Sequence, residues 1–144
     1  MIVGDSSALV ALSVMDRKVY VPQAVYDEIT IFAKPQGIKL THFLERKAVD
    51  TYLDISQVGL GCGELEAISL YKHLDADFLL IDDKRAKNFA KLNDVQVIGS
   101  LGVLVLAKKL GKVKTIKRDI EKLLKSDIFI SQILVDKILT MTGE

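Results

Sequence analysis

Short runs of β-branched and large apolar residues alternate with helix-like patterns along most of this 144-residue chain. The clearest run is Phe78-Leu79-Leu80-Ile81, which contains no polar residue and is typical of a strand buried on both faces. Strands that alternate with helices pair in parallel, because a helix carries the chain back to the start of the next strand. The pattern predicts a single α/β domain over residues 1–144, with three layers and a central, mostly parallel sheet of four or five strands.

The same reading places each expected element along the chain. Strands are expected at residues 2–3, 18–21, 78–81 and 95–98. Helices are expected after Ser6 or Ser7, from Pro22 as a first helical residue, and at 64–74, 84–92, 101–110, 116–125 and 131–141. The stretch 38–53 is expected to be helical towards its end.

Composition excludes several classes of protein. A single cysteine, Cys62, cannot close an intrachain disulfide, and with only two histidines in the chain it forms no zinc signature. The longest apolar run, 97–107, is shorter than the roughly 18 to 20 residues of a membrane span. The first five residues lack the basic region of a secretory signal. We therefore expect a cytoplasmic protein with no membrane segment.

Acidic residues follow two of the expected strands. Asp5 comes after the first strand, and Asp82 and Asp83 come after the third, at the sheet edge where α/β proteins bind ligands. Two more acids are placed by the helical angle of about 100° per residue. Glu28 flanks the apolar side of its expected helix, and Glu64 lies on the apolar side of the helix at 64–74.

On the same helices, the neighbouring acids Asp27 and Glu66 are expected to face solvent. Taken one at a time, each of the inward acids has an ordinary structural explanation, as a helix cap, a capping-box residue or a strand-to-helix turn. Taken together, acids that converge on one edge repel one another unless a cation lies between them. Ligands that are all oxygen, without a Cys or His cluster, favour Mg²⁺ or Mn²⁺.

At the level of motifs, the sequence resembles the PIN-domain ribonucleases, the fold of VapC-type toxins, and in particular a branch known mainly as predicted nucleic-acid-binding proteins. The matching segments run in the family's order over about the first 110 residues: Ile2-Val3-Gly4-Asp5-Ser6-Ser7, Val21-Pro22-Gln23-Ala24-Val25-Tyr26-Asp27-Glu28, Gly63-Glu64-Leu65-Glu66-Ala67-Ile68, Leu79-Leu80-Ile81-Asp82-Asp83 with Arg85-Ala86, and Val97-Ile98-Gly99-Ser100-Leu101-Gly102-Val103-Leu104.

The resemblance implies a catalytic and metal-binding quartet: Asp5, Glu28, Glu64 and either Asp82 or Asp83, with Asp83 favoured by spacing. It implies that Ser7 supports the first acid, and it puts Ile81 where the family usually carries a hydroxyl. The implied activity is Mg²⁺- or Mn²⁺-dependent cleavage of single-stranded RNA by the toxin of a toxin–antitoxin pair. Lys84 and Arg85 are candidate phosphate contacts, and an antitoxin protein and a second copy of the chain are the implied partners.

Alternative functions remain open at this point. An RNA-binding module with little or no turnover is favoured by Ile81 and by the unmatched residues after Gly111. A haloacid-dehalogenase-like phosphohydrolase needs an acid two residues after its nucleophile, where Ser7 stands. A dinucleotide site at the glycines of 59–63 lacks the full fingerprint.

Positive charge is unevenly distributed although the formal net charge is only +1. Residues 108–125 contain eight basic and two acidic side chains, in a stretch expected to be helical. Such a run is typical of a solvated helix face and is also able to follow an RNA backbone. The last two expected helices carry apolar faces that complete the core, or that contact a partner.

Overall fold

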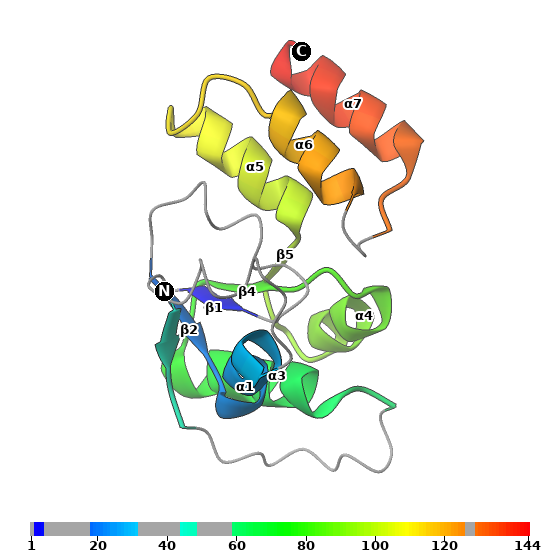
Figure 1. Cartoon of the computed structure of the whole chain (residues 1–144). Helices are drawn as coiled ribbons and strands as arrows, with labels where there is room; N and C mark the ends of the chain where they lie inside the picture. Colours follow the sequence, from blue (N-terminus) through cyan, green and yellow to red (C-terminus); the bar gives the residue numbers. More distant parts are fainter. Residues whose placement is uncertain (1, 5–17, 32–43, 49–58, 126–128) are drawn as a thin grey trace.

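The computed structural model describes residues 2–4, 18–31, 44–48, 59–125 and 129–144, with the backbone alone for 28–31 and 44 (Figure 1). Its strands are β1 (Ile2–Gly4), β2 (Val19–Val21), β3 (Leu44–Arg46), β4 (Phe78–Leu80) and β5 (Val97–Ile98). Its helices are α1 (Gln23–Ile31), α3 (Cys62–Leu74), α4 (Lys84–Leu92), α5 (Ser100–Lys109), α6 (Lys117–Leu124) and α7 (Gln132–Thr142).

The five strands form one parallel sheet in the order β3-β2-β1-β4-β5. Helices α5, α6 and α7 lie on one side of this sheet, and α3 and α4 lie on the other (Figure 1). The predicted three-layer α/β/α architecture with a parallel central sheet is confirmed.

Side chains of the two central strands alternate between two hydrophobic clusters. Ile2 and Leu80 share one cluster with residues of α5, whereas Val3 and Leu79 share the other with residues of α3 and α4. Successive side chains of a strand point to opposite faces, so strands covered on both sides need apolar residues at every position. This requirement explains why β1 and β4 were recognisable as unbroken apolar runs.

A third cluster joins the C-terminal helices to the rest. Leu104 of α5, Ile120 of α6 and Val135 of α7 are all buried in it. The apolar faces expected for the last two helices therefore pack on α5, and α5 contacts the sheet through its opposite face.

Several local expectations differ from the structure. Strand β3 lies inside the stretch expected to become helical, and it pairs with β2 at the sheet edge, Val21 opposite Arg46. Edge strands tolerate charged residues, and the sequence Leu-Glu-Arg has no apolar alternation by which to recognise it. Pro22 precedes α1 instead of opening it, and its carbonyl accepts the Tyr26 N–H at 3.0 Å.

Other boundaries shift by a few residues. β4 ends at Leu80, one residue before its expected end, and β5 is confined to the last two residues of 95–98. Because β3 intervenes, Asp82 and Asp83 follow the fourth strand and not the third. The helix expected after Ser6 or Ser7 lies outside the described residues.

One carboxylate ties the ends of three helices together. Glu144 Oε1 and Oε2 each accept the Ile116 N–H at 3.1 Å, and Oε1 accepts the Lys117 N–H at 3.3 Å, where α6 begins. Lys108, in the last turn of α5, donates to Glu144 Oε2 and to the Thr142 carbonyl of α7, both at 2.7 Å. The hydrogen bond from Lys108 lowers the pKa of Glu144 below its ordinary value of 4.5, and the two backbone N–H groups add to the effect against a smaller opposing effect of burial.

We predict that Glu144→Gln lowers the free energy of unfolding by about 1 kcal/mol at neutral pH, the usual effect of losing a helix cap. The folded-state pKa is depressed, so the wild-type advantage is present above pH 4.5 and disappears as the pH falls through the lower folded value. Urea unfolding of both proteins between pH 3 and pH 7 measures this difference. Glu121→Gln, an exposed change on α6, is the control; a pH-independent difference for Glu144→Gln would contradict the assignment.

Candidate functional site

The candidate site lies where the order of strands reverses in the sheet. From β1 the chain adds β2 and β3 on one side, and then returns to place β4 and β5 on the other side of β1. Such a switch point leaves a crevice at the carboxyl ends of the two adjacent strands, where α/β proteins bind ligands. Gly4 of β1 pairs with Leu80 of β4, so the two parallel strands end at the same edge of the sheet.

Asp82, two residues beyond β4, anchors the start of α5. Its Oδ1 accepts the Ser100 N–H at 2.9 Å, and its Oδ2 accepts the Ser100 hydroxyl. Ser100 is fully buried, and Lys87 Nζ of α4 lies 3.8 Å from Asp82 Oδ1. A Cβ on Gly99 would lie 2.9 Å from the same oxygen, so the glycine leaves room for the carboxylate. Asp82 thus joins the end of β4, α4 and the N-terminus of α5.

Asp83 has a different environment from its neighbour. It is the N-cap of α4, where its Oδ1 accepts the Ala86 N–H at 2.8 Å. The residue is exposed, in contrast to the side chain of Asp82, which is 10% exposed. Asp83 is therefore the more accessible of the two acids to a cation or substrate from solvent.

Glu64 stands in the first turn of α3 and is half-buried. Its Oε2 accepts the Gly61 N–H at 2.7 Å, which is the half of a capping box that a glutamate supplies, since Gly61 has no side chain for the reciprocal bond. The buried residues of α3 occupy a wide arc of the helix, and Glu66 is half-buried as well, so burial does not separate the two acids. Glu64 is thus a half-buried acid that binds the N-terminus of its own helix.

The expectation that Glu66 faces solvent is wrong. Its Oε2 accepts the Ala24 N–H at 3.1 Å, in the first turn of α1, and its Oε1 lies 3.5 Å from Cys62 Sγ. The first N–H groups of a helix have no partner within the helix, and α1 packs beside α3. Glu66 therefore fastens two helices together, a role that an angle measured on one helix does not reveal.

Basic side chains surround the start of α4. Lys84 and Arg85 are exposed in its first turn. The Arg85 guanidinium comes so close to Gly59 that a Cβ there would lie 2.7 Å from Nη2. Lys87 was missed from the sequence, although it stands one helical turn after Lys84 and so shares its face.

The remaining expected site residues are placed only in part. Asp5 and Ser7 lie outside the described residues, and Glu28 is placed on α1 by its backbone alone. Among the side chains that the structure describes, no three Asp, Glu, His or Cys residues are grouped as a metal site. The described acids, Glu64, Asp82 and Asp83, offer carboxylate oxygens only, and this donor set fits a hard cation such as Mg²⁺ or Mn²⁺.

Helices of the described part of the chain are all too short or too polar to cross a bilayer.

His73 is exposed in the last turn of α3, whereas Glu64 lies in the first turn of the same helix. Asp27 accepts a hydrogen bond from Gln23 at 2.6 Å in an exposed position, as expected for the outward acid of α1.

Comparison with known proteins agrees with this architecture. A PilT N-terminus domain protein from the hyperthermophilic archaeon Sulfolobus solfataricus P2 has a similar fold, with a TM-score of 0.59 and 20% sequence identity, over 74% of this chain and 92% of that protein. No curated protein matches the sequence significantly. The family model described as DUF3368: PIN domain matches residues 1–144. The chain therefore belongs to the PIN-domain family.

Proposed function

We propose that this protein is a metal-dependent endoribonuclease that cleaves single-stranded RNA. The observation that carries the proposal is the placement of Asp82 and Asp83 at the carboxyl end of β4, beside the end of β1, in a chain that belongs to the PIN-domain family. PIN domains are generally nucleases, and the accessible acid at this edge, Asp83, has the chemistry that such a site needs.

In this proposal Asp5, Glu28, Glu64 and Asp83 hold one or two Mg²⁺ or Mn²⁺ ions. When bound, such ions activate a water for attack on the phosphodiester and stabilise the charge that develops on phosphorus oxygens. Ser7 orients the first carboxylate. A carboxylate serves as the proton acceptor, because the histidine that the structure describes, His73, is exposed in the last turn of α3, far along the helix from Glu64. Lys84 and Arg85 hold the RNA phosphates from the first turn of α4.

Asp83 is proposed as the ligand of the acidic pair, and Asp82 as a positioning residue. The Asp82 oxygens already accept two hydrogen bonds from Ser100, with Lys87 close by, and its side chain is mostly buried. Removing Asp82 from the start of α5 to bind a cation would leave the buried Ser100 N–H without its acceptor. Asp83 accepts the Ala86 N–H and is open to solvent, so its carboxylate is able to contact a cation while capping α4.

The protein is further proposed to be the toxin of a toxin–antitoxin pair, acting in the cytoplasm and as a homodimer. The family resemblance supports this role, and exposed apolar residues on α6 and α7, Leu124, Ile133 and Met141, offer contacts for a partner protein. Growth arrest on expression, relieved by the product of a small adjacent gene, tests the role. Normal growth would contradict it without affecting the nuclease proposal.

A module that binds RNA without cleaving it is the second candidate. It is favoured by Ile81, which is fully buried in the core beside α3 and α4 and supplies no hydroxyl at the position where the family usually has one. The cleavage experiments below distinguish the two functions.

We predict that Asp5→Asn, Glu28→Gln and Glu64→Gln each reduce cleavage of a single-stranded RNA in Mg²⁺ or Mn²⁺ by at least about 100-fold. The side-chain oxygen of glutamine at position 64 still accepts the Gly61 N–H, so folding is expected to persist. Rates are measured on a labelled RNA, and thermal melting checks the fold. Asp27→Asn and Glu66→Gln are the matched controls, and a glutamine at position 66 keeps an acceptor for the Ala24 N–H. Equal losses in both sets, or no cleavage by the wild type, would contradict the proposal.

We also predict opposite effects for a change at Asp83 and a change at Ser100, the buried donor to Asp82. Asp83→Asn is expected to abolish cleavage and leave the melting temperature almost unchanged, because Asn caps helices as well as Asp does. Ser100→Ala is expected to reduce the free energy of unfolding by about 1 to 3 kcal/mol, because the Asp82 carboxylate loses a buried donor, and to retain part of the activity. Melting curves and cleavage rates of the two variants, with Asp82→Asn alongside, decide the assignment. A destabilised Asp83→Asn that still cleaves would reverse it.

A further inference from the structure

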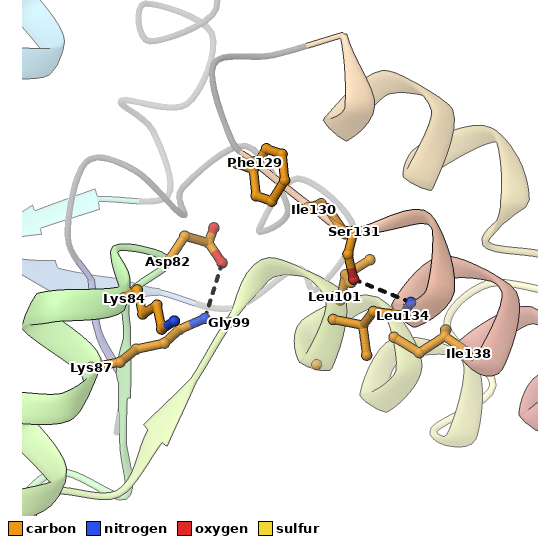
Figure 2. Close-up of a pocket in the computed structure, with 11 residues that line it drawn as sticks. Asp82, Lys84, Lys87, Gly99, Leu101, Phe129, Ile130, Ser131, Leu134 and Ile138 are labelled. Atoms are coloured by element: carbon orange, nitrogen blue, oxygen red, sulfur yellow. Dashed lines mark hydrogen bonds and ion pairs between the residues drawn. The ribbon is translucent and has the colours of Figure 1, made fainter.

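A groove opens next to the candidate site, between α4 and α7. It has a volume of about 590 Å³ and is lined by residues that follow β4 and β5 and by the segment that leads into α7. Asp82, Lys84 and Lys87 lie at one end, apolar residues including Leu101 and Leu134 lie at the other, and Phe129 stands between them (Figure 2). We name it the α4–α7 groove.

Phe129 is the most unusual residue of this groove. Its side chain is 95% exposed, the largest value among the exposed large apolar residues of the described chain. Two residues later, Ser131 caps α7 by accepting the Leu134 N–H at 3.4 Å, so the segment that carries Phe129 is joined to a helix packed in the core. A ring presented in this way offers a flat face to a ligand, and bases stack on such faces.

The charged end of the groove complements a phosphate. Lys84 and Lys87 are one turn apart on α4, and both line the groove. Among the carboxylates that the structure describes, Lys87 is ion-paired with Asp82 at the long distance of 3.8 Å. Asp83, the proposed metal ligand, lies between Asp82 and Lys84 in the sequence, so a phosphate at this end is next to the proposed site of cleavage.

The groove fits an unpaired nucleotide better than a duplex. Its volume is within the range of about 300 to 1,000 Å³ that is usual for sites of single small ligands. Bases of an RNA duplex are stacked inside the helix and cannot reach an aromatic ring, whereas bases of a single strand can turn outward. Aromatic faces and cations that line the same groove are the arrangement that proteins use for single strands.

We propose that the α4–α7 groove binds one unpaired nucleotide of the RNA substrate, next to the scissile phosphate, with its base stacked on Phe129 and its phosphate held by Lys84 and Lys87. This inference rests on the proposed nuclease function and extends it, because it assigns the preference for single-stranded RNA to a defined residue outside the acidic site.

Binding without cleavage tests the proposal. The probe is a fluorescein-labelled single-stranded RNA of mixed sequence, about 12 nucleotides long so that it spans one binding site, titrated with the full chain in EDTA and followed by anisotropy. Phe129→Ala is expected to weaken binding by about 10-fold or more, and Phe129→Tyr to restore it, since both aromatic rings stack. The same sequence as a duplex is expected to bind equally to wild type and Phe129→Ala. Thermal melting is expected to be unchanged, because the ring is exposed.

Two matched controls separate the groove from the rest of the surface. Ile133→Ala removes another apolar side chain of α7, 83% exposed and not among the described residues that line the groove, and is expected to leave RNA binding unchanged. Lys84→Ala is expected to lower the slope of log affinity against log salt by about 0.7 in magnitude, the value for one phosphate contact on a single strand. Lys91→Ala, in the last turn of α4, is expected to change it little.

The outcomes distinguish this inference from the function on which it rests. If Phe129→Ala binds RNA as the wild type does and still cleaves it, the proposed nucleotide site in the α4–α7 groove is contradicted and the nuclease proposal is unaffected. Loss of binding by Phe129→Ala in a protein that never cleaves RNA would support the groove and contradict the nuclease. Loss of self-association in both Phe129→Ala and Ile133→Ala, with RNA binding unchanged, would overturn it in favour of a protein contact.

Discussion

The parallel pairing of β1 with β4 is the constraint on which the rest of the structure depends. It places the first strand of the chain next to a strand that lies far along the sequence, and it sets Gly4 opposite Leu80. Neither strand has room for polar side chains, because both are covered by helices on each face. Polar side chains are consequently expected beyond the strand ends, and the pairing sets the ends of β1 and β4 at one edge of the sheet.

At that edge, the acids act first as helix caps. Asp82 accepts the first N–H of α5, Asp83 caps α4, and Glu64 accepts the Gly61 N–H at the start of α3. From the sequence alone, the convergence of these acids called for a cation to relieve their repulsion. The structure shows that backbone N–H groups, the Ser100 hydroxyl and Lys87 already stabilise them. The case for a metal is thus stronger for exposed Asp83 than for Asp82, which is committed to holding α5.

The helices and central strands were predictable because their signals are local. Helix α4 was expected at its observed bounds, since Asp83 provides a cap and the buried Ala86 and Ala90 recur at helical spacing. Strand β3 was not, because at the edge of the sheet its Leu-Glu-Arg sequence needs no apolar alternation. The contacts that build the site were not predictable, because they join residues of different elements. The Asp82–Ser100 hydrogen bond joins residues 18 positions apart, and the hydrogen bond from the Ala24 N–H to Glu66 joins residues 42 positions apart. Phe129 gave no signal, because an isolated aromatic residue before a helix belongs to no periodic pattern.

These contacts also change the meaning of the nearly neutral net charge. The acids at the edge of the sheet accept hydrogen bonds from helix N-termini, and Glu144 accepts them from the start of α6 and from Lys108. The negative charge of these carboxylates is therefore partly compensated within the protein. Most lysines of the basic stretch 108–125 are exposed instead. A polyanion approaching the protein consequently meets more positive charge than the total of +1 suggests. Lys84 and Lys87 extend this positive charge into the α4–α7 groove, so the groove lies within the part of the surface that attracts a polyanion.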